Sequence, residues 1–209
     1  MDDFLIFGSK GYGLMLLALF FSRGMDILST WVATPNLVLE GNPIAKLLGW
    51  RWGLPINIGI CLVLAFWPLP AIVLSTTSVL VAARNFQSAW LMRSMGEEGY
   101  RDWHVARIRE TPITIFLLCL AGNTLLTASV GGVIILFSNL SLVPFAIGAG
   151  IVAYGGAVAF YTLLALWRLR RASLRQEQRA RKYAADEASL ALPNASLPTV
   201  CAPEDAVGK

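Results

Sequence analysis

Five long runs of apolar residues, separated by short polar segments, set the pattern of this sequence. A helix rises about 1.5 Å per residue and needs about 20 mostly apolar residues to cross a hydrocarbon core about 30 Å thick. The runs lie at about residues 12–33, 53–67, 71–95, 113–138 and 142–167. We therefore predict an all-α integral membrane bundle of five transmembrane helices, with short interfacial helices in its loops.

The segment "WPLP" separates the second run from the third. Pro68 and Pro70 each lack a backbone N–H and restrict the residue before them, which favours a break between two helices. The alternative is one kinked helix followed by a re-entrant piece. The sequence leaves this alternative open, because periodicity defines helix ends poorly.

The composition excludes a soluble globular domain. Hydrophobic residues make up 56% of the 209 residues and charged residues only 14%, whereas soluble domains average about 25% charged residues. The charges also gather after the last run, where seven of the 17 Lys and Arg residues lie between Arg168 and Lys182. We predict a transmembrane bundle at residues 1–167, a basic juxtamembrane helix at 168–190 and a disordered tail at 191–209.

The positions of Lys and Arg in the short loops predict the orientation. Cytoplasmic loops carry an excess of these residues. Basic residues follow the first, third and fifth spans, whereas the opposite side holds only Lys10. We therefore expect the amino terminus outside and the carboxyl terminus in the cytoplasm, with the protein in the cytoplasmic (inner) membrane of a bacterium.

The first span carries a polar stripe. Its members recur mostly at spacings of three and four residues, which places them on one helix face: Ser22, Arg23, Asp26, Ser29 and Thr30. A charge near the middle of a bilayer costs at least about 2.5 kcal/mol on insertion scales, so it normally faces the bundle interior and has a partner. The stripe therefore predicts an intramembrane polar cluster.

Two partners compete for Asp26. Arg23 can pair with it locally, three residues earlier on the same helix. Arg84, in the "VAARNFQSAW" of the third span, offers a partner from another helix, with Asn85 beside it. Asp26 and Arg84 each lie about 13 residues past the start of their spans, about 20 Å deep. Both pairings remain open.

The loop after the first span adds two residues to the predicted cluster. Asn42 is suited to cap a helix that begins at Pro43, and Glu40 is expected at the cytoplasmic border, on the same side of the bundle as Asp26. The predicted binding cluster, in the cytoplasmic half of the bundle, consists of Arg23, Asp26, Ser29, Thr30, Glu40, Asn42, Arg84 and Asn85.

These residues carry a family resemblance. Asp26, Ser29 and Thr30, followed by Glu40, Asn42 and Pro43, resemble the D-x-x-[ST]…E-x-N-P pattern of a domain-of-unknown-function family of small bacterial and archaeal multi-pass membrane proteins. The likeness covers about the first 95 residues, and a glycine common before the glutamate of that family is absent from "PNLVLEG". The resemblance implies a site at these residues but no activity.

The loop between the third and fourth spans has two interpretations. Its mixture of aromatic and charged residues suits an interfacial helix. It is also weakly similar to the closing signature of isoprenylcysteine-type membrane methyltransferases, at Gly96, Glu97, Glu98, Tyr100, Arg101, Arg107 and Pro112. His104 is the only histidine of the chain, and the three cysteines have no ligand spacing. We therefore predict no metal, no cofactor and no disulfide.

Two features suggest partners. Ala149, Ala153 and Ala157 recur every four residues, which lets helices approach closely. The simplest reading is packing against Ala128 and Gly132 of the fourth span, and the alternative is a homodimer. The basic segment Arg168–Lys182 is expected to attract anionic lipids. No aromatic platform accompanies it, so nucleic-acid binding is not expected.

Three functions fit these features. The favoured one is a non-enzymatic module whose cluster binds a membrane partner or an anionic lipid headgroup, held between Arg23, Arg84 and the loop. The second is an enzyme on a lipid-linked or membrane-embedded substrate, with Asp26 or Glu40 as acid or base and Arg84 gripping an anionic group. The third is a small-solute or proton transporter, although no internal repeat is visible.

Overall fold

The computed structural model describes residues 4–139 and 141–191, and it describes the side chains of that part except those of 172–182, 184, 185 and 188–191. The described chain contains six helices: α1 (Lys10–Ala33), α2 (Pro43–Leu64), α3 (Pro68–Met95), α4 (Glu97–Glu110), α5 (Ile113–Leu136) and α6 (Leu142–Ala191). No strand occurs in these residues. The predicted all-α fold is confirmed.

Five helices are long and apolar enough to cross a membrane: α1, α2, α3, α5 and the part of α6 from Leu142 to Arg171. The protein is a multi-pass membrane protein, as the hydrophobic pattern predicts. Helix α6 continues to Ala191, through the segment where a juxtamembrane helix is expected. Beyond Ala191, the segment predicted to be a disordered tail lies outside the described residues.

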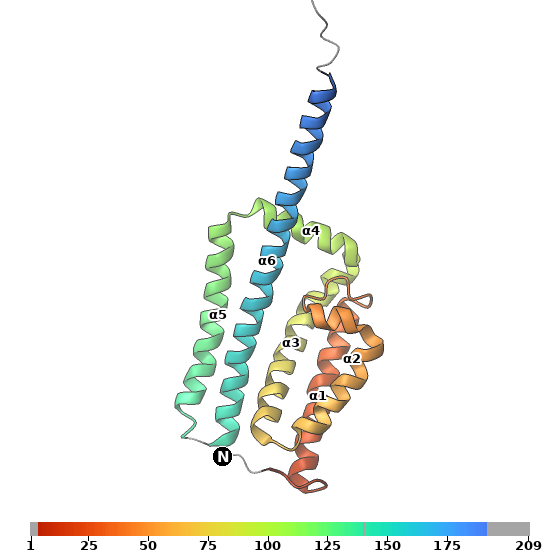
Figure 1. Cartoon of the computed structure of the whole chain (residues 1–209). Coiled ribbons are helices and arrows are strands. Elements are labelled where there is room, and N and C mark those ends of the chain that lie inside the picture. The colour runs from red at the N-terminus through yellow and green to blue at the C-terminus, as the bar shows by residue number, and fades with distance from the viewer. Residues whose placement is uncertain (1–3, 140, 192–209) are drawn as a thin grey trace, which may run out of the picture. The chain divides into compact units, whose positions relative to one another are not determined.

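The residues up to Ala165 form one compact unit, and those from Leu166 onward belong to another. Within the first unit, successive spans run in alternating directions (Figure 1). Helices α1 and α3 lie side by side, α2 packs on both, and α6 contacts α3 on another side and α5 in turn. Helix α4 is the interfacial piece that connects α3 to α5.

A local cap defines the end of the loop between α1 and α2. The side chain of Asn42 accepts a hydrogen bond from the Ile44 N–H at 3.0 Å, and Pro43 is the first helical residue. The predicted cap is confirmed. Gly49, at φ 59°, then breaks α2 into a short leading piece and the span itself. A positive φ costs glycine little because it has no Cβ.

Helices α2 and α3 are separate. Helix α2 ends at Leu64, and α3 begins at Pro68 after Trp67. The alternative of one kinked helix with a re-entrant piece is therefore wrong. Proline suits the first turn of a helix, where its missing N–H has no intrahelical acceptor.

A buried apolar group joins the end of α2 to α1 and α3: Tyr12, Leu19, Cys61, Ala65 and Ala71. The Tyr12 hydroxyl donates to the Leu62 carbonyl at 3.3 Å. Before α1, the Leu5 N–H donates to the Phe66 carbonyl at 2.9 Å. These contacts fasten this end of α2, while most of its other side chains stay exposed, as befits a helix that faces lipid.

Glycines bring α5, α6 and α3 together. A Cβ added at Gly131 would lie 2.7 Å from the Gly148 carbonyl oxygen, and one at Gly148 would lie 2.6 Å from that of Gly131. On α6, Gly150 contacts α3, where the Thr77 hydroxyl donates to its carbonyl at 3.1 Å. Close approach of this kind needs residues without bulk.

The predicted packing of the alanine stripe Ala149, Ala153 and Ala157 against Ala128 and Gly132 is wrong. Nothing lies within 4 Å of a Cβ added at Gly132, and Ala153 is exposed. Helix α6 instead presents Gly148 and Gly155 to α5. Small residues occur on neighbouring faces of α6, with Ala149 beside Gly148 and Ala153 two residues before Gly155. The sequence alone therefore did not show which of these faces contacts α5.

Five spans place the two ends of the bundle on opposite sides of the membrane, which labelling can test. With Cys61, Cys119 and Cys201 replaced, we expect a cysteine at Ser9 to react with an impermeant thiol reagent on intact bacterial cells. A cysteine at Thr111, after α4, is expected to react only once the cells are permeabilised. If Thr111→Cys reacts on intact cells and Ser9→Cys does not, the orientation is opposite to the predicted one. If both variants react, or neither does, the number of spans between Ser9 and Thr111 is not odd.

Candidate functional site

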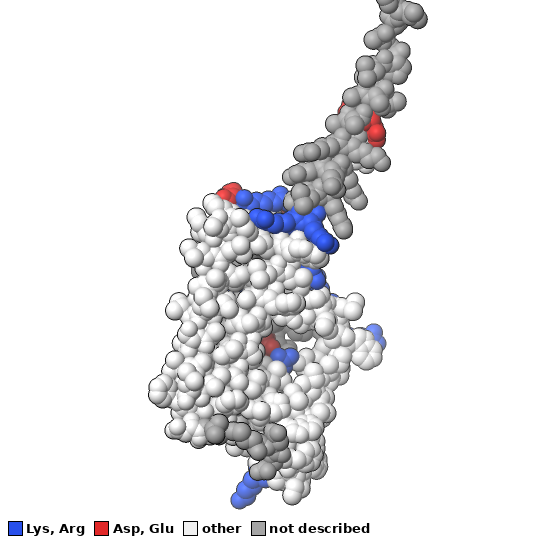
Figure 2. All heavy atoms as spheres, turned by 60° about the vertical axis from the view of Figure 1, so that its left-hand side comes forward, with Lys and Arg blue, Asp and Glu red and all other residues white. Residues whose placement is uncertain are grey.

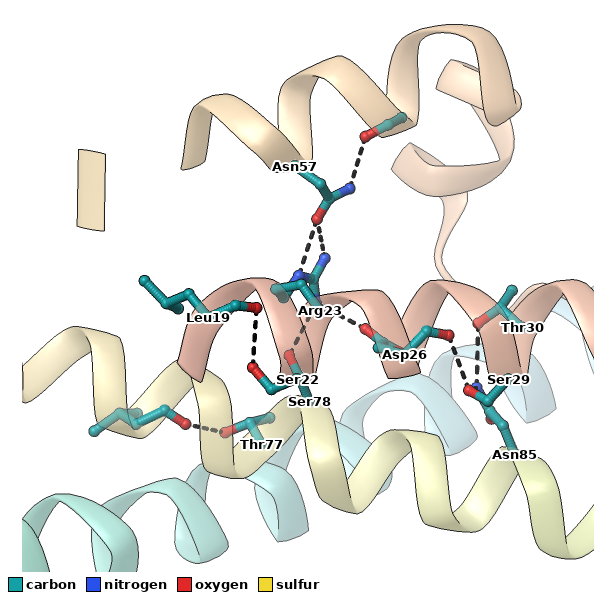
Figure 3. A network of polar contacts seen from close by, with 12 residues as sticks. Leu19, Ser22, Arg23, Asp26, Ser29, Thr30, Asn57, Thr77, Ser78 and Asn85 are labelled. Carbon is teal, nitrogen blue, oxygen red and sulfur yellow. Dashed lines mark hydrogen bonds and ion pairs between the residues drawn. The ribbon is translucent and has the colours of Figure 1, made fainter. Parts of the chain in front are cut away.

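Arg23 is the centre of a polar network that joins three spans (Figure 3). Its Nη1 donates to Asp26 Oδ2 at 2.7 Å and to the Ser78 hydroxyl of α3 at 3.1 Å. Its Nε donates to Asn57 Oδ1 of α2 at 2.9 Å, and its Nη2 donates to the same oxygen. All three guanidinium nitrogens therefore donate to groups of the protein itself. The local Arg23–Asp26 pair, one of the two predicted pairings, is present.

Each neighbour of Arg23 is held in place by its own helix. The Asn57 amide nitrogen donates to the Gly53 carbonyl, one turn earlier, at 2.7 Å, which turns the amide oxygen toward α1. Ser78 is buried on the stripe of α3 that faces α1, where Ala71, Ala82 and Ala89 are also buried. Small residues on this stripe let α1 and α3 approach closely.

A second group of hydrogen bonds continues the network along α1. The Asn85 amide nitrogen, on α3, donates to the Ser29 hydroxyl at 3.3 Å and to the Thr30 hydroxyl at 3.2 Å. Ser29 in turn donates to the backbone carbonyl of Asp26 at 2.8 Å. The structure therefore brings together Arg23, Asp26, Ser29, Thr30 and Asn85 of the predicted cluster.

Arg84 does not join the cluster, and the predicted Asp26–Arg84 pair is wrong. Asp26 pairs with Arg23, while the Arg84 side chain is exposed and takes part in none of the described ion pairs. Arg84 follows Ser78 by six residues, about 240° around the helix. It therefore lies on the face that Thr77 presents to α6. Matching depth identified the right level of α3 but not the right direction, and Asn85 occupies the position facing α1.

Glu40 and Asn42 lie in the loop that follows α1. The Asn42 N–H donates to Glu40 Oε1 at 2.7 Å. The Glu40 carboxylate is close enough to act electrostatically on that of Asp26. The Asn42 side chain caps α2, which is the structural role that its position before Pro43 predicts.

Hydrogen bonds from several directions hold this loop. The Trp50 indole N–H donates to the Pro35 carbonyl at 2.7 Å, and the Leu39 N–H donates to the Thr34 hydroxyl at 3.1 Å. From α4, Glu97 Oε1 accepts the Asn36 N–H at 2.9 Å. The loop that carries Glu40 is therefore fixed to the beginning of α2 and to α4.

Most residues of the methyltransferase-like signature lie in α4, with Gly96 before the helix and Pro112 after it, and two ion pairs form along the helix. Arg101 pairs with Asp102 at 3.2 Å and Arg107 with Glu110 at 2.8 Å, all of them exposed. The Tyr100 ring stacks on His104 with centroids 5.8 Å apart. Apolar and charged residues alternating along a short helix between two spans agree with an interfacial helix.

The side chains of the Arg23–Asp26 ion pair are mostly buried in the protein, but part of each is exposed at the surface. The side chains are 23% and 16% exposed, respectively. Figure 2 shows an acidic and a basic side chain together inside a hollow, part of the way along a face that is otherwise mostly uncharged. Asp26 is the only acidic residue in the five spans. Its second oxygen, Oδ1, makes none of the described hydrogen bonds.

Two residues of the network were missed by the sequence reasoning. Asn57 is the only strongly polar side chain in "LPINIGICLVLAF" and could have been identified by the same cost argument as Asp26. Ser78 carries no such signal, because serine and threonine are common in membrane helices, where they can bond to their own backbone. Among the described residues, no group of three His, Cys, Asp or Glu side chains is placed to hold a metal ion.

No protein family, no curated protein and no solved structure matches this chain. The chemistry of the site must therefore be inferred from the cluster around Arg23 and Asp26 itself.

Proposed function

We propose that this protein is a non-enzymatic membrane module whose cluster around Arg23 and Asp26 holds the headgroup of a membrane lipid. One observation carries the proposal: polar side chains of three spans converge in a hollow on a face that is otherwise mostly uncharged (Figure 2). Charged groups inside membranes are costly and tend to mark binding or transport sites.

The chemistry of the cluster favours binding over catalysis. The nitrogens of Arg23 are bound to Asp26, Asn57 and Ser78, so the guanidinium is fixed in place and shared within the protein. The described side chains around it form no pair of a nucleophile with a base. An enzyme would have to use Asp26 or Glu40 alone as its acid or base.

The position of the cluster favours a lipid as the occupant. Apolar side chains near it on α2 and α3 are exposed, among them Ile56, Ile60 and Val79. In a membrane these side chains contact acyl chains. A headgroup that enters between them brings its own acyl chains to cover this apolar surface.

Two further partners, anionic lipid at the basic segment and a second copy of the chain, are also proposed. We propose that the basic segment Arg168–Lys182 binds anionic lipid, with most of its side chains outside the described part. The alanine stripe Ala149, Ala153 and Ala157 is proposed as a contact for a second copy. We also propose that the chain is related to the uncharacterised family whose pattern Asp26, Ser29 and Thr30 resemble. The presence of these three residues in the cluster supports this proposal.

Native mass spectrometry tests the lipid-binding proposal. We expect the purified protein to retain lipid, and Asn57→Leu, which removes the α2 partner of Arg23, to reduce the retained lipid about tenfold. Asn123→Leu is the matched control, because Asn123 is exposed on α5, which contributes nothing to the described cluster. Equal retention by wild type and Asn57→Leu would contradict the proposal. A stoichiometric protein partner in place of lipid would favour a partner-binding module.

A further inference from the structure

We infer that the head of the lipid held at the cluster is an uncharged hydroxyl group, as in diacylglycerol. This inference rests on the proposed lipid-binding function and names the class of its ligand. The sequence suggests an anionic headgroup clamped between Arg23 and Arg84. In the structure Arg23 is bound within the protein and Arg84 lies on another face, so this clamp does not form.

The charges around the cluster favour a ligand without charge. Arg23 and Asp26 form an ion pair at 2.7 Å, and their charges cancel. The segment between α1 and Gly49 carries one charge of each sign, on Glu40 and Lys46, so the sum is zero whether or not these two are counted. A phosphate or an ammonium would leave a net charge beside the pair, and uncompensated charge is costly where the dielectric constant is low.

The open atoms of the ion pair match a hydroxyl. Asp26 Oδ1 accepts none of the described hydrogen bonds, and among the described residues it is not one of the enclosed side-chain oxygens without a partner, so it is open to the surface. The guanidinium of Arg23 has five N–H groups. The described bonds use one of these on Nε, two on Nη1 and one on Nη2, which leaves one. One acceptor and one donor therefore remain, and a hydroxyl donates one hydrogen bond and accepts another.

These two open groups lie on neighbouring atoms. Nε and Nη2 of Arg23 both donate to Asn57 Oδ1, which engages the two N–H groups on that side of the planar guanidinium. The remaining N–H of Nη2 points away from that side, next to an N–H of Nη1, and Nη1 binds Asp26 Oδ2 and Ser78. A hydroxyl in the hollow donates to the other oxygen of that carboxylate and accepts from Nη2.

The depth of the pair in the membrane favours an uncharged lipid. Arg23 lies near the middle of α1, ten residues before the last helical residue, Ala33, which is about 15 Å at 1.5 Å per residue. A phosphate drawn to this depth would leave the aqueous interface at a high cost. A lipid that has only a hydroxyl head reaches it without that cost.

The apolar surroundings identify the hydroxyl as that of a lipid. Ile56 and Val79, the chain neighbours of Asn57 and Ser78, are exposed, and so is Ile60 one turn further along α2. Water or a free alcohol would fill the hollow without covering these side chains. Diacylglycerol places its hydroxyl at the ion pair and its acyl chains over the apolar surface, and it brings no phosphate.

Native mass spectrometry of the full chain tests the ligand class, in lauryldimethylamine oxide because this detergent has no hydroxyl group. The protein is incubated with equal amounts of dioleoylglycerol and of its 3-acetyl ester, in which the hydroxyl is capped. We expect wild type to retain about tenfold more dioleoylglycerol than ester, since only the free hydroxyl donates to the Asp26 carboxylate. An equal amount of dioleoylphosphatidic acid is expected not to displace the dioleoylglycerol, although it also binds basic segments elsewhere.

A variant and a matched control connect this retention to the ion pair. Asp26→Asn is expected to lower the retained dioleoylglycerol about tenfold, because the carboxylate that accepts its hydroxyl is lost. The variant also leaves the Arg23 charge uncompensated, so phosphatidic acid is expected to displace what remains. Glu98→Gln removes an exposed carboxylate on α4 and is expected to retain as much dioleoylglycerol as wild type.

The outcomes separate this inference from the proposed function. Equal retention of dioleoylglycerol and its ester by wild type, displacement by phosphatidic acid, or retention by Asp26→Asn at the level of wild type overturns the hydroxyl inference and leaves lipid binding intact. Displacement by an equal concentration of glycerol overturns the lipid source. Retention of no lipid, added or carried from the cell, overturns the proposed function. If Asp26→Asn does not fold, the comparison of the two lipids on wild type carries the test.

Discussion

Replacing Arg23 by methionine is expected to lower the free energy of unfolding by about 3 kcal/mol. The change leaves the Asp26 carboxylate, only 16% exposed, without its ion pair. It also removes the hydrogen-bond donors of Asn57 Oδ1 and the Ser78 hydroxyl, which join α1 to α2 and α3. Removing one member of a buried pair costs more than the pair itself contributes, because the remaining charge stays buried. Unfolding by sodium dodecyl sulfate in mixed micelles measures the loss.

Two further variants show whether the pair is responsible. Arg84→Met removes an arginine from the third span that is exposed and outside the cluster, and we expect a change within about 0.5 kcal/mol. The double change Arg23→Met with Asp26→Leu removes both charges, and we expect it to recover most of the loss. A single Arg23→Met variant as stable as wild type would show that the pair does not hold the three spans together.

The second large effect is expected at the contact of α5 with α6. Gly148→Ala is expected to destabilise the protein by about 3 kcal/mol, at the upper end of ordinary overpacking. The new Cβ would meet the Gly131 carbonyl oxygen at 2.6 Å and the Ile135 backbone nitrogen at 3.1 Å, and backbone atoms cannot rotate away as a side chain end does. The same unfolding measurement in mixed micelles tests it.

Gly132→Ala is the matched control for this contact. Gly132 lies next to Gly131 on α5, but nothing lies within 4 Å of an added Cβ there. We expect no loss, and a gain of up to about 1 kcal/mol, since alanine favours the helix more than glycine does. If Gly132→Ala destabilises the protein as much as Gly148→Ala does, the face that α5 turns toward α6 is the predicted one, not the described one.

The number of the spans, and the extent of all but the second, could be predicted because a membrane helix must satisfy its backbone internally and cover its surface with apolar side chains. The second span was predicted at 53–67, whereas α2 runs from Pro43 to Leu64. Both requirements act on each segment by itself. The cap at Asn42 could be predicted for the same reason, since the cap and its acceptor lie two residues apart. Features of this kind depend on neighbouring residues alone.

The partners across helices could not be predicted as well. The level of Asp26 on α1 and of Arg84 on α3 could be counted from the span starts, but the rotation of one helix about its axis relative to another could not. One residue of difference, from Arg84 to Asn85, turns the side chain by about 100° and decides which of them faces α1. For the same reason the sequence predicts that Gly132 of α5 contacts α6, whereas in the structure Gly131 makes this contact.

The hydrogen-bond partners of Arg23 follow one another in the order of synthesis. Asp26 is made three residues after it, Asn57 arrives with α2 and Ser78 with α3, and none of the described partners comes from α5 or α6. As the ribosome delivers the spans to the bilayer, the first charge is compensated at once by its own helix and then enclosed by each new arrival. The last two spans consequently join an assembly in which Arg23 already has all its described partners, and they pack through close glycine contacts and the Thr77 hydrogen bond to Gly150.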